Sequence, residues 1–243
     1  MKRIVSFALL LSPLWAAAQT SIPTVTVGVG GTKAGSDVAT SLQIVLLLTV
    51  LSLAPALLIL TTAFTRIVII FSFVRSALGT PNIPPNQVIV GLSLFLTFFV
   101  MGPTYRNIND SALQPFLAKK ITQAQALERA SGPAKAFMLK NTYEKDLRLF
   151  LDLRNERPAT REEVKIETLI PAFVISELKT AFVVGFYIFI PFVMIDLVVA
   201  SGLMSMGMMM LPPTTVSLPA KLLVFVLADG WGTLVSAILQ GYR

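Results

Sequence analysis

The sequence predicts an all-α membrane protein, with two hydrophobic helical hairpins and a charged, mostly helical insertion between them. Of the 243 residues, 54% are hydrophobic and only 14% are charged. The mean hydropathy of +0.75 lies far above that of soluble domains. Long apolar stretches occupy residues 42–105 and 169–243, whereas residues 106–167 hold 12 of the 20 Lys and Arg residues and 9 of the 13 Asp and Glu residues.

The N-terminus has the pattern of a secretory signal peptide. Lys2 and Arg3 precede a short apolar run, and three alanines end at Ala18. We expect cleavage between Ala18 and Gln19, leaving residues 19–41 as a flexible segment. An uncleaved anchor is the alternative, but the apolar run is shorter than the ~20 residues that a spanning helix needs. A signal peptide predicts a bacterial inner-membrane protein whose mature N-terminus faces the periplasm.

Residues 42–105 predict the first hairpin. Residues 42–64 are uncharged, long enough to span a membrane, and contain Pro55, which favours a kink. Arg66 and Arg75 follow, and the positive-inside rule assigns them to the cytoplasmic side. A Pro-rich turn near residues 80–85 leads into a second uncharged stretch up to residue 105.

Residues 106–168 predict the charged insertion. Apolar side chains recur at helical spacing between Pro133 and Arg154, which predicts one helix. Thr160 and Glu163 have capping-box spacing. This helix either packs within a small domain of its own chain or forms a contact in an oligomer, since about 60 residues bury little core alone. The signal peptide places the insertion in the periplasm, although its many Lys and Arg residues oppose the positive-inside rule, which is weak for loops of about this length.

Residues 169–243 predict the second hairpin, with a methionine-rich loop at its tip. Gly207 and the pair Pro212-Pro213 interrupt helix formation there. Thioether side chains are flexible and apolar, so a continuous run of them favours a water-excluding seal over simple core filling. The loop methionines are Met204, Met206, Met208, Met209 and Met210.

Five charged residues lie within or beside the apolar segments of this second hairpin: Glu177, Lys179, Asp196, Lys221 and Asp229. Ionisable groups in such segments usually face a bundle interior or water. Asp196 and Lys221 flank the methionine-rich loop, so they either pair across the hairpin or line a water-filled path. Glu177 and Lys179 are two residues apart and point to different faces of a helix, so they are not partners.

Composition excludes several chemistries. The chain has no Cys and no His, which rules out disulfides, Cys or His metal ligands and His acid–base catalysis. No nucleophile–base pair, acidic cluster or phosphate-binding loop is evident, so we expect neither catalysis nor a metal nor another cofactor. The net charge of +7 is better explained by membrane-flanking residues than by nucleic-acid binding. Membrane lipid is therefore an expected partner and nucleic acid is not.

Several long strings resemble the FliP family of type III secretion export gate proteins. The resemblance covers residues 42–105 and 165–235. The strings are TTAFTRIV at 61–68, VRSALGT at 74–80, PAFVISELKTAF at 171–182, PFVMIDL at 191–197, GMMMLPP at 207–213 and ADGW at 228–231.

The resemblance implies a channel subunit of the flagellar export gate. Such proteins form a ring of five copies, completed by FliR and surrounded by FliQ, through which unfolded flagellar proteins pass. It places the chain in the inner membrane at the flagellar basal body, partly on the periplasmic side, and makes the methionine-rich loop a gasket. An injectisome system is the close alternative. From the residues alone, a proton-coupled transporter with a relay through Asp196, Glu177 and Lys221 is a second hypothesis, although no inverted repeat is evident.

Overall fold

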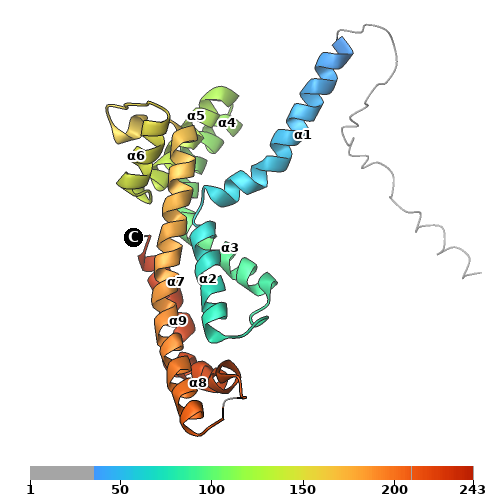
Figure 1. Cartoon of the computed structure of the whole chain (residues 1–243). Helices are drawn as coiled ribbons and strands as arrows, with labels where there is room; N and C mark the ends of the chain where they lie inside the picture. The colour runs from blue at the N-terminus through green and yellow to red at the C-terminus, as the bar shows by residue number, and fades with distance from the viewer. Residues whose placement is uncertain (1–35, 209, 243) are drawn as a thin grey trace, which may run out of the picture. The chain divides into compact units, whose positions relative to one another are not determined.

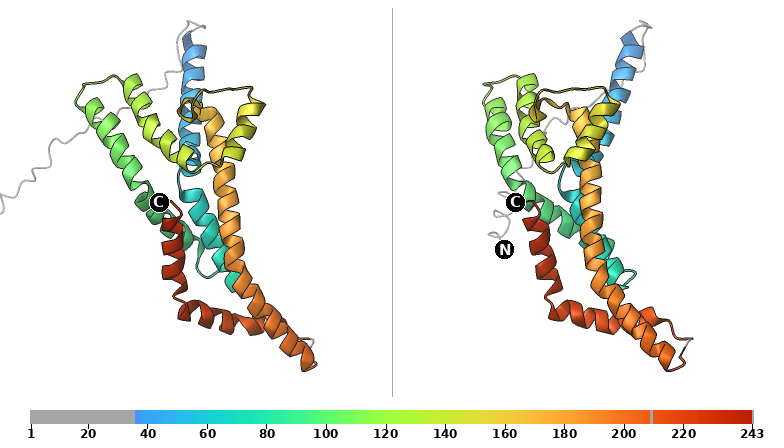
Figure 2. Two further views of the ribbon diagram at one scale, coloured as in Figure 1. Left: turned by 90° about the vertical axis from the view of Figure 1, so that its left-hand side faces the viewer. Right: turned by 60° about the vertical axis from the view of Figure 1, so that its left-hand side comes forward.

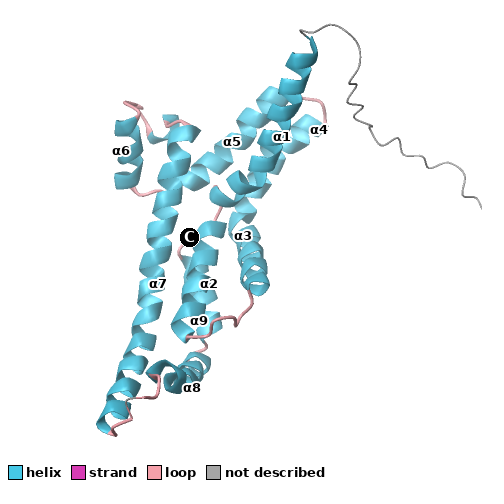
Figure 3. Cartoon of the chain, turned by 45° about the vertical axis from the view of Figure 1, so that its right-hand side comes forward, coloured by secondary structure: helices cyan, strands magenta, loops and turns pink. Residues whose placement is uncertain are grey.

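The computed structural model describes residues 36–208 and 210–242, and every regular element in that part of the chain is helical (Figure 3). The all-α prediction is therefore confirmed for these residues. The predicted signal peptide, its cleavage site between Ala18 and Gln19, and most of the predicted flexible segment lie outside the described residues. The chain divides into two compact units, one ending at Leu48 and one beginning at Thr49.

Helix α1 (Ser36–Leu60) runs across the boundary between these units. None of its most hydrophobic stretch, from Leu42 to Leu60, is buried. Pro55 lies inside the helix without ending it. The helix ends where Thr61 and Thr62 donate hydroxyl hydrogen bonds to the carbonyls of Leu57 and Ile59.

The second unit is organised along α7 (Ile166–Ser205), which packs against α2 (Phe64–Leu78) (Figure 1). At 40 residues, α7 is about 60 Å long. One face of α2 is buried, and Ile67, Ile70 and Phe71 lie in the main hydrophobic core. Gly79 then ends α2 in the left-handed conformation, with a φ of 76°. After the turn, α3 (Asn86–Ile108) packs against α2.

The structure places a third helix within the predicted first hairpin. The stretch between α1 and α3 is a helix, α2, and it carries both Arg66 and Arg75. Arg66 is almost fully buried and its charge serves an internal contact. The assignment of Arg66 and Arg75 to the cytoplasmic side stays a prediction. The membrane arrangement of two hairpins stays a prediction.

The charged insertion contains several short helices. The π-helical turn η1 (Asn109–Leu113) and α4 (Gln114–Leu117) lead into α5 (Gln123–Lys140) and α6 (Glu144–Leu153). The single helix predicted from Pro133 to Arg154 is wrong: Pro133 lies inside α5, which begins at a capping box of Thr122 and Gln125. The chain breaks between α5 and α6 because the Tyr143 amide donates to Ser176 Oγ on α7, at 3.0 Å.

The predicted capping box at Thr160 is also wrong. Glu163 accepts a hydrogen bond from the Ala159 amide, and the segment forms only the 3-10 turn η2 (Arg161–Glu163). The helix that follows is α7. Its first turns share a hydrophobic core with α5 and α6, through Leu169, Ala172 and Phe173. The insertion therefore packs on its own chain, and an additional role in oligomer contacts stays a prediction.

The chain closes with α8 (Pro213–Leu227) and α9 (Gly230–Gln240), which turns back along α2 and α7 (Figure 2). These two helices meet at a 62° bend, where Asp229 adopts a left-handed conformation. By length and composition, α1, α3 with its continuation, and α7 could each cross a membrane. The bent pair α8–α9 adds a fourth candidate if it is one broken span.

The contact between α2 and α7 depends on Gly185. A Cβ atom there would lie 2.4 Å from the Phe73 ring. We expect Gly185→Ala to lower the stability of the folded chain by about 1–3 kcal/mol, because the ring and α2 must move. Gly202→Ala is the control, since its added Cβ meets nothing within 4 Å on the same helix. Thermal unfolding in detergent, followed by circular dichroism, measures both; equal midpoints would contradict this packing.

Candidate functional site

The methionine-rich loop joins α7 to α8 and is exposed in the isolated chain. Met204 belongs to the last turn of α7, which ends when Gly207 takes a φ of 74°. The amides of Gly207 and Met208 then bond to the carbonyls of Met204 and Leu203, at 3.1 and 2.9 Å. Pro212 and Pro213 start α8. The loop is therefore held at both ends, with a short connection between them.

The four described loop methionines do not fill a core. Met206 is 67% exposed and Met210 is 98% exposed, while Met204 and Met208 are also exposed. Met209 lies outside the described residues. The core-filler interpretation is wrong for these four side chains, since an apolar side chain that fills a core is buried within its own chain. Several neighbouring apolar groups exposed together form a surface suited to contact with another chain.

An ion pair connects α7 and α8, the two helices that the loop joins. Lys221 Nζ lies 2.7 Å from Asp196 Oδ2 and donates a second hydrogen bond, of 3.2 Å, to the carbonyl of Ala77 near the end of α2. Ser217 Oγ donates to the other oxygen of Asp196. The sequence left two interpretations of Asp196 and Lys221, a pair across the hairpin or the lining of a water-filled path. The structure contains the pair. It ties the base of the methionine-rich loop to the C-terminal end of α2.

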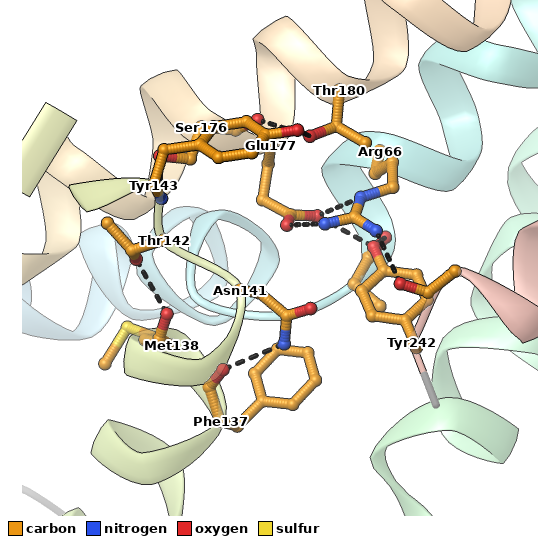
Figure 4. Close-up of polar contacts among 12 residues, drawn as sticks. Arg66, Phe137, Met138, Asn141, Thr142, Tyr143, Ser176, Glu177, Thr180 and Tyr242 are labelled. Atoms are coloured by element: carbon orange, nitrogen blue, oxygen red, sulfur yellow. Dashed lines mark hydrogen bonds and ion pairs between the residues drawn. The ribbon is translucent and has the colours of Figure 1, made fainter. Parts of the chain in front are cut away.

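A second ion pair lies at the other end of α2. Arg66 Nε donates to Glu177 Oε2 at 2.9 Å, and the Arg66 Nη2 group contacts Oε1 (Figure 4). Glu177 is fully buried. Tyr242 donates to the same carboxylate at 2.7 Å, and the Arg66 guanidinium lies 4.0 Å above the tyrosine ring. The arrangement joins α2, α7 and the end of the chain.

Tyr242 acts in this cluster as a neutral hydrogen-bond donor. Burial raises the pKa of its hydroxyl well above the ordinary value, and the negative charge of Glu177 raises it further, against the opposing effect of Arg66. Its ring stacks on Phe137 of α5, and its carbonyl accepts a hydrogen bond from Lys140. The end of the chain is thus fixed between the apolar helices and the insertion.

The remaining predicted residues have separate surroundings. Lys179 contacts Asp146 of α6, which also accepts a hydrogen bond from Ser176. Arg75 donates to Asn86 across the turn between α2 and α3. Asp229 is exposed at the bend between α8 and α9. Glu177 and Lys179 therefore have different partners, as their spacing predicts.

The predicted relay through Glu177, Asp196 and Lys221 is not assembled. Glu177 and Asp196 lie on the same helix, 19 residues apart, which corresponds to about 28 Å. Each has its own cationic partner on a different element. The structure therefore provides two separate ion pairs, each of which stabilises helix packing.

Sequence reasoning missed Tyr242, Asp146 and Ser217 as partners. A usable signal existed for Arg66 and Glu177: two opposite charges inside or beside apolar segments, where an unpaired charge is costly. That signal does not say which acid pairs with which base. No comparable signal marks Tyr242, because a tyrosine near a chain end is common at any surface.

A double-mutant cycle tests the pair of Asp196 and Lys221. Asp196→Asn leaves the buried ammonium without its counter-ion, so we expect a loss of about 3 kcal/mol in stability. Lys221→Met in the same chain should restore part of that loss. The exposed pair Glu144 and Arg148 is the control, with a coupling below about 1 kcal/mol. Additive effects of Asp196→Asn and Lys221→Met on the unfolding midpoint would contradict the pairing.

Comparisons with known proteins show the family of this chain. The model of the FliP family matches residues 47–238. The chain is 54% identical to the flagellar biosynthetic protein FliP of Bacillus subtilis, over 85% of this chain and 94% of that protein. It is 52% identical to the protein of the same name from Pectobacterium carotovorum, over 86% and 81% of the two chains, and 47% identical to that from Aquifex aeolicus, over 84% and 86%. The chain belongs to the FliP family.

Proposed function

We propose that the chain is a channel-forming subunit of the flagellar protein export apparatus in the bacterial inner membrane. Its relatives are flagellar biosynthetic proteins, and three or four of its helices are suited to a membrane. The observation that carries the channel role is the exposed methionine-rich loop. An exposed apolar loop between two apolar helices is suited to contact with copies of itself, which would exclude water from the contact.

In the proposed assembly, several copies bring their methionine-rich loops to one axis. Five copies, with FliR and FliQ as partners, follow from the family resemblance. A ring of flexible thioethers would exclude water and ions, as hydrophobic constrictions do in other pores. The same side chains would adapt to varied unfolded flagellar proteins, because Met has several accessible rotamers and no directional polar group.

The ion pair of Asp196 and Lys221 would support this seal. It holds the middle of α8 against α7 and the end of α2, so the two helices that carry the loop are fixed to each other. A seal made from flexible side chains needs helices that stay in place, since otherwise the loops themselves would move apart. The role is mechanical, and the proposal assigns the chain no catalytic step.

Truncating the methionines tests the seal. Met204, Met206 and Met210 changed together to Ala should raise the closed-state ion leak of the assembled complex, by more than the sum of the three single changes, because neighbouring side chains can fill one gap but not several. Leu197→Ala is the control: this residue is also apolar and exposed on α7 but lies outside the loop.

The leak is measured as conductance in planar bilayers, beside native mass spectrometry that reports the subunit number. An intact complex with unchanged conductance in the triple variant would refute the seal while leaving membership of the export apparatus in place. A complex that fails to assemble calls for the same measurement on the variants with two substitutions.

A further inference from the structure

Two neighbouring hollows on α7 and α6 have opposite chemical character. The first, which we term the apolar groove, has a volume of about 460 Å3 and only apolar lining residues: Phe73, Phe182, Phe186, Phe189, Ile190, Val193 and Met194. The second, the charged cleft, has a volume of about 610 Å3 and is lined by Glu144, Lys145, Asp146, Arg148, Leu149, Asp152 and Lys179. Both volumes are in the range of ligand sites.

The helical repeat of α7 aligns the two hollows. Lys179, Phe182 and Phe186 are separated by three and four residues, so they lie on one face of the helix, and Phe189 and Val193 continue that stripe. Lys179 lines the charged cleft, and Phe182 begins the apolar groove. The cleft is therefore placed at one end of the groove. From Phe182 to Met194 the groove extends about 18 Å.

Aromatic contacts between α2 and α7 hold one wall of the groove in place. The Phe73 ring of α2 fits against Gly185 and meets Phe182 and Phe189 edge to face, with ring centroids 5.2 and 6.2 Å apart. Such a wall exists before any ligand arrives, which lowers the entropy that binding must overcome. Near the junction with the charged cleft, the hydroxyls of Tyr143 and Thr180 are hydrogen-bonded at 3.0 Å. Exposed tyrosines are typical of the level where lipid headgroups meet hydrocarbon.

We propose that these hollows form one phospholipid site, with an acyl chain in the apolar groove and a zwitterionic headgroup in the charged cleft. The cleft carries three basic and three acidic side chains, among which Arg148 pairs with Glu144 and Lys179 pairs with Asp146. A headgroup with both charges can replace both partners of such a pair, whereas a purely anionic headgroup would take the base and leave the acid without a partner. A lipid also accounts for the abrupt change from charged to wholly apolar lining. The inference does not rest on the proposed channel function.

The experiment measures lipid binding to the full chain by native mass spectrometry in detergent. The probes are phosphatidylethanolamine, which carries phosphate and ammonium, and phosphatidylglycerol, which lacks the ammonium. We expect phosphatidylethanolamine to bind about tenfold more tightly, as one added hydrogen bond between charged groups predicts. Equal binding of the two lipids would overturn the headgroup assignment.

Two matched pairs of variants locate the site. Arg148→Gln, in the charged cleft, should weaken phosphatidylethanolamine binding, whereas Arg154→Gln, an arginine also paired with glutamates but outside the cleft, should not. Val193→Trp fills the apolar groove and should displace the acyl chain. Val198→Trp adds the same side chain at another exposed valine of α7, outside the groove, and should leave binding unchanged.

Other outcomes overturn the inference. Equal losses from Val193→Trp and Val198→Trp would mean that the lipid covers α7 without a defined site. If Val193→Trp prevents assembly but leaves lipid binding unchanged, the groove holds a helix of another protein chain. Because lipid binding is measured directly, a failure here is distinguishable from a failure of the methionine seal, which is measured as conductance.

Discussion

The buried ion pair between Arg66 and Glu177 is the contact on which the remaining architecture depends. It fixes the first turn of α2 to α7, and it also positions Tyr242, so that the end of the chain returns to the same point. Breaking such a pair leaves an uncompensated charge among apolar helices, which is strongly destabilising. The pair therefore adds little net stability. It favours one packing of α2 on α7, because other packings would leave the two charges unpaired.

The same logic recurs along α7. Near its start, Asp146 of the insertion is satisfied by Ser176 and Lys179, and near its end Asp196 is satisfied by Ser217 and Lys221. Three polar clusters thus set the register of α6, α2 and α8 along one helix. Apolar packing alone would be less selective, since shifting one apolar helix along another by a turn costs little when lipid surrounds both. The methionine-rich loop lies beyond the last cluster, and no ion pair fixes its described residues.

The sequence predicted the parts of the fold that depend on periodicity and composition. The apolar run of α7, the charged insertion and the loop after Gly207 could all be recognised. The break after α5 could not, because it arises from a contact between the Tyr143 amide and Ser176, which are distant in sequence. The pairing of Arg66 could not be predicted, because neighbouring sequence cannot show that Glu177 lies opposite. Pairings between distant charges are properties of the packed helices, so they appear only when the packing is known.

The central claim, that methionine-rich loops from several copies meet at one axis, can be tested most directly by cross-linking. The chain contains no cysteine, so Met206→Cys introduces a single thiol into the loop. A disulfide needs Cα atoms within about 7 Å of each other. If the loops converge, mild oxidation of the membrane-embedded assembly should produce covalently linked pairs of chains, and Met194→Cys should not. A thiol at position 206 that never cross-links, and that a water-soluble maleimide modifies fully in the closed assembly, would contradict the claim.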